Sequence, residues 1–100
     1  GDAGETLPTE FALNGNYPNP FNAVTEIRYD LPQNARVSLV LYNMLGQEVR
    51  SLVNHDLPAG RHTAAWDGRN NNGGDMTSGI YLVRLVASEH TFTGKVMLLK

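Results

Sequence analysis

Hydrophobic and polar residues alternate with a period of two along most of the chain, the pattern expected of half-buried β-strands. The clearest example is residues 25–31, in which Ile27, Tyr29 and Leu31 share one face and charged residues occupy the other. The segment 37–42 is apolar on both faces, so it is predicted to lie in the middle of a sheet. The sequence shows no useful helical periodicity.

The segment 37–42 begins a predicted β-hairpin that covers residues 36–53. Its connection carries Asn43, whose side chain can bond its own backbone, and Gly46, which can adopt a positive φ. The return strand is more polar, so it is predicted to lie near an edge of the sheet. We expect the other strands to pack against this hairpin and pair with it.

Turn-forming residues separate the remaining apolar segments at short, regular intervals. The further strands are expected at 61–66, 79–87 and 91–100. The turns and loops are expected at 32–35, 55–60, 67–75 and 88–90. Trp66, beside small alanines, is predicted to be buried, and Gly94 indicates a bulge or a close packing contact. About six or seven strands with this spacing predict an all-β protein, an antiparallel β-sandwich.

Residues 1–10 and residues 11–22 differ in composition. Residues 1–10 are small, acidic and polar, and are predicted to be a flexible linker from an upstream domain; the folded domain is predicted to be 11–100. Residues 11–22 interleave aromatics with Asn, Gly and Pro, which favours an extended edge segment. Its aromatics Tyr17 and Phe21 are expected to plug the end of the core; the alternative is a ligand-binding aromatic loop.

Composition narrows the range of functions. One hundred residues make one domain, with 41% hydrophobic residues and a formal net charge of −2. The eight lysines and arginines are scattered, so no nucleic-acid partner is expected. The absence of cysteine removes thiol catalysis and thiolate metal sites. No apolar run approaches the roughly 20 residues that span a bilayer, so no transmembrane segment is expected.

No residue pattern supports catalysis. His55, His62 and His90 stand at no ligand-like spacing and are predicted to face solvent. No serine lies in a nucleophile-elbow pattern, and no glycine-rich loop is suited to phosphate binding. The chain is therefore not expected to be an enzyme or to hold a cofactor.

The loop 67–75 offers one alternative, a calcium site. Asp67, Asn71 and Asp75 recur at a spacing of four and carry the oxygen ligands that calcium binds. However, Arg69 takes an acceptor position of a calcium loop, and Ser78 stands where a closing Glu is needed. We therefore expect a polar turn without a metal.

Motifs in order along the chain together resemble the type A C-terminal sorting domain of the type IX secretion system. The most distinctive are Asn16-Tyr17-Pro18-Asn19-Pro20-Phe21-Asn22, Tyr42-Asn43-x-x-Gly46-Gln47, Trp66-Asp67-Gly68, Ser78-Gly79-Ile80-Tyr81 and Lys95-Val96-Met97-Leu98-Leu99-Lys100. The central motifs also resemble the immunoglobulin-like domain of flagellar hook-capping proteins. Sorting domains stand at the extreme C-terminus of their proteins, and the last apolar strand here ends at Lys100, which favours the first resemblance.

The resemblance implies an immunoglobulin-like β-sandwich of about seven strands and a role as a sorting signal. Its partners would be the outer-membrane type IX translocon, a surface sortase-like protease and an upstream cargo domain. The protein would pass through the periplasm to the outer-membrane surface or the extracellular space. The residues that the resemblance implies for partner recognition are Lys95, Val96, Met97, Leu98, Leu99 and Lys100.

The final strand is expected to lie near a sheet edge, where unpaired backbone groups would let a partner add its own strand. Two alternatives remain open. The first alternative to a sorting signal is an interaction module of the hook-capping kind, which is not cleaved. The second is a carbohydrate-binding module of a secreted enzyme. Against the latter, Tyr29, Trp66 and Tyr81 fall on predicted core faces, which leaves few aromatics for sugar stacking.

Overall fold

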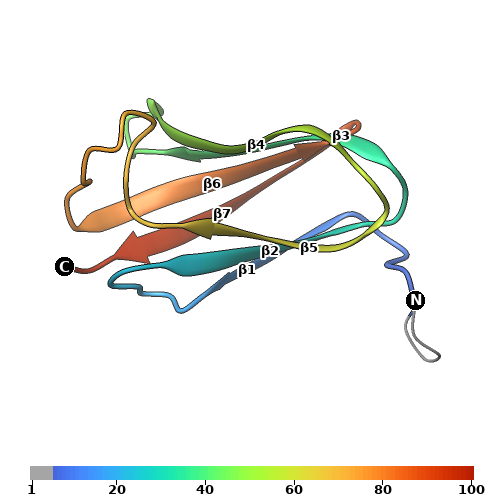
Figure 1. Cartoon of the computed structure of the whole chain (residues 1–100), viewed down its shortest axis with the longest axis horizontal. Helices are drawn as coiled ribbons and strands as arrows, with labels where there is room; N and C mark the ends of the chain where they lie inside the picture. Colours follow the sequence, from blue (N-terminus) through green and yellow to red (C-terminus); the bar gives the residue numbers. More distant parts are fainter. Residues whose placement is uncertain (1–5) are drawn as a thin grey trace.

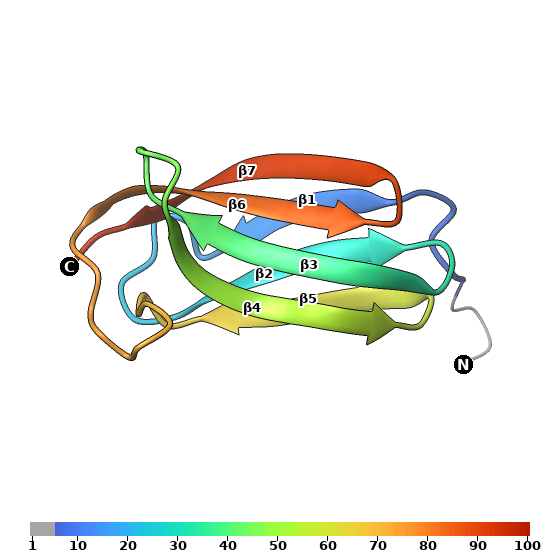
Figure 2. The ribbon, with the colours of Figure 1, turned by 90° about the horizontal axis from the view of Figure 1, so that it is seen from above.

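The computed structural model describes residues 6–100, which form two antiparallel sheets packed face to face (Figures 1 and 2). The strands are β1 (Ala12–Tyr17), β2 (Thr25–Leu31), β3 (Ala35–Tyr42), β4 (Glu48–Leu57), β5 (Gly60–Trp66), β6 (Gly79–Ala87) and β7 (His90–Leu98). One sheet has the order β1-β2-β5 and the other β4-β3-β6-β7. The predicted all-β sandwich is confirmed. Residues 6–100 contain no helix of the length and apolarity needed to cross a membrane.

The core lies between the sheets because alternate residues of each strand point inward. Trp66 is fully buried, as predicted, and its ring meets that of Tyr81 edge to face, with centroids 5.2 Å apart. Burial of such rings supplies much of the hydrophobic stabilisation of a small domain. Across residues 6–100, every fully buried side-chain nitrogen or oxygen has a hydrogen-bond partner.

The central hairpin has the predicted arrangement. β3 lies between β4 and β6, and β4 forms an edge of the four-stranded sheet. The amides of Leu45 and Gln47 both donate to Asn43 Oδ1 over 3.0 Å, and Gly46 has φ 83°. The predicted turn chemistry of Asn43 and Gly46 is therefore confirmed.

The connection between β4 and β5 is shorter than predicted. The turn was expected at 55–60, but β4 continues to Leu57 and β5 begins at Gly60. The reason is that β3 remains paired with β4 as far as the partners Ala35 and Leu57. The pairing with β3 thus keeps His55 and Asp56 in the strand, although their polar composition favours a turn.

β1 lies at an edge, as predicted, but contains a bulge that reverses its alternation. Between Leu13 and Asn16 the register with β2 shifts by one residue, and Gly15 there has φ 86°. Asn16 therefore turns inward and its Nδ2 donates to Thr25 Oγ1 over 2.9 Å. Tyr17 turns outward and is 71% exposed, so the prediction that it plugs the core is wrong.

Close packing explains the glycine in β7. A Cβ built at Gly94 would lie 3.4 Å from side-chain atoms of both Leu13 and Val83. That separation is at the short limit of ordinary van der Waals contact, so little room is left for a side chain at this position. The predicted packing role of Gly94 is confirmed, without a register shift in β7.

The predicted linker 1–10 is described only in part, because residues 1–5 lie outside the described residues. Residues 6–10 form no strand, but they touch the domain. Pro8 is buried, and Arg61 Nη1 donates to the carbonyl of Thr6 over 2.8 Å. The division into linker and domain stays a prediction.

Candidate recognition site at the C-terminal strand

The six residues implied as a recognition site form the end of β7 and the two residues beyond it. Val96 and Leu98 point into the core and are fully buried. The outward-facing residues are Lys95, Met97, Leu99 and Lys100. Because a partner can touch only outward groups of the folded domain, Val96 and Leu98 act in folding.

Residues 19–22, in the connection from β1 to β2, lie alongside this stretch of β7. Phe21 forms a parallel bridge with Leu98, and its amide donates to the carbonyl of Met97 over 2.9 Å. The amide of Leu99 in turn donates to the carbonyl of Phe21, also over 2.9 Å. Residues 19–22, which make these contacts, are termed the latch.

Two asparagine side chains extend the pairing. Asn19 Oδ1 accepts from the amide of Met97 at 3.0 Å, while its Nδ2 donates to the carbonyl of Lys95 at 3.2 Å. The side-chain amide thus imitates a peptide group of a neighbouring strand. Asn22 Nδ2 donates to the carbonyl of Leu99 at 3.2 Å. Each such bond contributes about 0.5–1.5 kcal/mol to stability.

The latch is anchored by the Phe21 ring. Phe21 is 2% exposed, and its ring centroid lies 5.3 Å from that of Trp66. Gly68 passes so close that a Cβ there would lie 3.5 Å from Leu98 and 3.8 Å from Phe21, and its φ is 75°. The prediction that Phe21 closes the end of the core is confirmed.

The hypothesis of an open edge at this end of β7 is wrong. The outward-facing carbonyls of Lys95, Met97 and Leu99 and the amides of Met97 and Leu99 already have partners. A partner strand could pair here only after displacing the latch. Recognition of the folded domain would therefore depend on outward side chains.

The two lysines of this segment differ in their surroundings. Lys100 Nζ lies 3.8 Å from Asp75 Oδ1, an oxygen that also lies 3.3 Å from Arg69 Nε. None of the ion pairs found among residues 6–100 involves Lys95. Lys95 therefore presents its charge to a partner with less competition than Lys100.

The loop considered for calcium uses its oxygens within the protein. Asp67 Oδ1 accepts from the amide of Arg69 at 3.1 Å, and Asp75 Oδ1 accepts from Arg69 Nε. Asn71 Oδ1 accepts from the amide of Ser51 at 2.9 Å. Within the part of the chain that the structure describes, no three His, Asp or Glu side chains gather as metal ligands would.

The histidines lie in separate environments. His55 is exposed, and His90 is exposed while stacking on Phe11 with centroids 4.5 Å apart. His62 is half-buried against Tyr29, with centroids 5.4 Å apart, so the prediction that it faces solvent is wrong. The reason is that His62 shares the inward face of β5 with Trp66. Burial raises the pKa of the neighbouring Tyr29.

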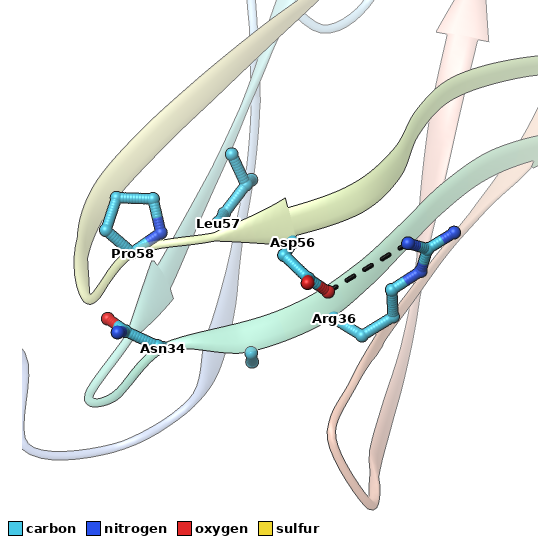
Figure 3. A pocket seen from close by; sticks show the side chains of 6 residues that line it. Asn34, Arg36, Asp56, Leu57 and Pro58 are labelled. Carbon is cyan, nitrogen blue, oxygen red and sulfur yellow. Dashed lines mark ion pairs between the residues drawn. The ribbon is translucent and has the colours of Figure 1, made fainter.

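A shallow hollow lies at the opposite end of the sandwich, between the β2–β3 loop and the end of β4 (Figure 3). Arg36 Nη1 lies 3.9 Å from Asp56 Oδ1, and Arg36 Nη2 donates to two oxygens of Asn54. Asn34 Oδ1 accepts from the amide of Ala59 at 2.9 Å. Its polar groups are thus engaged with one another, and we assign it no chemistry.

The chain matches the sequence model of one protein family. Residues 19–90 match the FlgD Ig-like domain, and this range includes the latch and six of the seven strands in whole or in part. The chain belongs to the FlgD Ig-like domain family. The predicted resemblance to the immunoglobulin-like domain of hook-capping proteins is confirmed. No similar curated protein was found.

Solved structures share the fold of this FlgD Ig-like domain. Latent dimeric PorU from Porphyromonas gingivalis matches 89% of the chain with a TM-score of 0.68 and 19% identity. PorZ, a surface component of the type IX secretion system of the same organism, matches 90% with a TM-score of 0.59 and 17% identity. The chain spans only 9% and 11% of the lengths of these proteins.

The family match ends at residue 90, so it does not include the candidate site at 95–100. Sequence reasoning identified this site but missed its partners Asn19 and Asn22. The signal that could have found Asn19 is its place directly before Pro20. Pro20 has no backbone donor, so the side-chain amide beside it can replace a backbone group in an edge contact.

Proposed function

We propose that this FlgD Ig-like domain is a C-terminal sorting signal, recognised as a folded unit by the outer-membrane type IX secretion machinery. It would direct an upstream cargo domain through the periplasm to the outer-membrane surface or the extracellular space. It would have no catalytic role. A sortase-like surface protease would then cut the chain before the folded domain.

The single observation that carries the proposal is the arrangement at the end of β7. The strand is locked to the core by Val96 and Leu98, and its backbone edge is covered by the latch, while Lys95 and Met97 face outward. A preorganised surface loses less conformational entropy on binding than a loose tail would. The fold shared with PorZ, a component of the type IX secretion system, also supports the proposed link to that system.

Family membership favours a second candidate, an interaction module that is not cleaved. The match to the FlgD Ig-like domain covers residues 19–90 and leaves out the end of β7. Such a module would bind a neighbouring protein through surfaces within the matched range. Changes at 95–100 that preserve folding would then leave its binding intact.

The first test fuses the chain, behind a signal peptide and a reporter protein, in a host with type IX machinery. We expect the reporter at the cell surface. With Lys95→Glu and Lys100→Glu together, surface reporter should fall roughly tenfold, as for a loss of about 1.4 kcal/mol of binding free energy. The missing reporter should accumulate in the periplasm.

Arg28→Glu with Arg36→Glu is the matched control. These arginines form exposed ion pairs of 3.9 Å with Glu26 and Asp56, so the pair of changes alters net charge equally away from β7. Both double variants should melt close to the unmodified domain, because exposed pairs contribute about 0–1 kcal/mol. Equal surface delivery of both double variants would contradict recognition at β7. Deleting 95–100 is a weaker test, since it also removes buried Val96 and Leu98.

A further inference from the structure

Exposed large hydrophobic side chains are concentrated at one end of the sandwich. Among residues 6–100, six of the seven belong to segments at the end where β1, β3, β5 and β7 finish. The six are Tyr17, Val24, Met44, Leu45, Ile80 and Leu99. The seventh, Leu7, lies near the start of the described chain. Because exposed apolar side chains usually scatter singly over a surface, this concentration calls for an explanation.

The topology brings these segments together. Odd-numbered strands run toward this end and even-numbered strands run away from it, since every pair of neighbours is antiparallel. The loops 18–24, 43–47 and 67–78 therefore meet there with residues 99–100, and together they are termed the distal end. Figures 1 and 2 show these loops on the side of the C-terminus, while the described chain starts at the opposite side.

The β3–β4 turn is the most exposed apolar element of the distal end. Leu45 is 85% exposed and Met44 is 62% exposed. Their backbone is nevertheless fixed, because Asn43 bonds with Leu45, Gly46 and Gln47 through its side chain and its peptide groups. Two apolar side chains held outward on an ordered turn are suited to insertion into a partner at low entropic cost.

The pairing of charges at the distal end favours a protein partner over an anionic membrane. Arg50 lies 3.4 Å from Asp67, and Asp75 lies within 4 Å of both Arg69 and Lys100. The cations of this region are thus largely paired with its own carboxylates. An anionic membrane surface attracts clusters of unpaired Lys and Arg, which this arrangement does not offer. A protein surface with an apolar patch fits it better, because interface centres are poor in charge and rich in aromatics and Met.

We propose that the distal end is a docking surface for an apolar patch on a partner protein, with Met44 and Leu45 as its anchors. This inference rests on the proposed function, in which the partner is a component of the outer-membrane machinery. The distal end shares Leu99 and Lys100 with the candidate site, but its anchors come from a different hairpin, β3–β4. Cargo joined at the other end of the sandwich would leave the distal end accessible.

The test uses the reporter fusion with Met44→Ser and Leu45→Ser together. Surface delivery should fall at least about tenfold, as for the loss of a binding hot spot. The control Leu7→Ser removes a 62% exposed apolar side chain at the opposite end and should leave delivery unchanged. Both proteins should melt like the unmodified domain, since these side chains are largely exposed. A photoreactive phenylalanine analogue in place of Leu45 should crosslink to an outer-membrane protein.

Each other outcome is decisive. If the unmodified fusion never reaches the surface, the proposed function fails and this inference fails with it. If the unmodified fusion is delivered and the Met44/Leu45 variant is delivered equally, only the docking surface is overturned. Flotation with phosphatidylcholine vesicles that depends on Leu45 would indicate a membrane instead. A dimer in sedimentation that disappears in the variant would indicate a second copy, and would likewise overturn the inference.

Discussion

At each edge of the four-stranded sheet, an asparagine from a loop forms hydrogen bonds with the backbone of the edge strand. At the β4 edge, the amide of Asn71 donates to the carbonyl of Val49, and the amide of Ser51 donates to Asn71 Oδ1, both over 2.9 Å. At the β7 edge, Asn19 makes the corresponding side-chain contacts and Phe21 adds backbone pairing. Both edges are thus covered near the distal end by an asparagine from a loop.

The difference lies in what holds each asparagine in position. Asn71 is exposed and lies in a polar loop, and its contacts are with Glu48, Val49 and Ser51 of the edge strand. The latch is fixed by the buried Phe21 ring, which packs on Trp66, so the β7 edge is coupled to the core. An edge strand with unpaired groups invites association with other chains. The comparison indicates that β7 is protected more firmly than β4.

Removing the anchor should have the largest effect. Phe21→Ala is expected to lower the free energy of unfolding by about 3–5 kcal/mol, because it deletes a buried ring and leaves a cavity beside Trp66. Tyr17→Ala, in the same connecting region but at a 71% exposed side chain, is the control and should change it by less than about 0.5 kcal/mol. Denaturant unfolding measures both. Equal effects would mean that the latch is not anchored through its ring.

Exchanging the asparagines should give a smaller and local effect. Asn19→Ala and Asn71→Ala should each lower the free energy of unfolding by about 1–2 kcal/mol, through the loss of exposed hydrogen bonds. Amide exchange should then quicken at Met97 in the first variant and at Ser51 in the second. Faster exchange at both amides in either variant would show that the two edges are not independent.

Much of the fold follows from sequence because its strands obey simple alternation. The segment 79–87 was predicted as a strand and is observed as β6, Gly79–Ala87. Nearly every position in it is apolar, which favours a buried strand, and the two-residue period places Tyr81, Val83 and Leu85 on one face, which is the buried one. The central place of β3 followed from its lack of a polar face. The position of a strand and its buried face can be predicted because both depend on residues close together in the sequence.

The edge contacts could not be predicted because they depend on single side chains from distant parts of the chain. Asn19 and Met97 are 78 residues apart, and one amide group joins them. The outward turn of Tyr17 follows from one extra residue in β1, which composition does not reveal. The candidate site was thus located by sequence resemblance, while the condition of its backbone became apparent only from the fold.

The most direct test of the account is amide hydrogen exchange along β7 in the unmodified domain. The register of β7 with β6 is unbroken, so the amides of Thr93 and Met97 point the same way, away from β6. Of these two amides, that of Met97 donates to the latch, at Asn19, and that of Thr93 does not; the amide of Leu99 also donates to the latch, at Phe21. We expect Met97 and Leu99 to exchange at least about tenfold more slowly than Thr93, since paired amides exchange only through opening. Exchange of Met97 and Leu99 as fast as Thr93 would contradict a closed edge and restore strand addition as the mode of recognition.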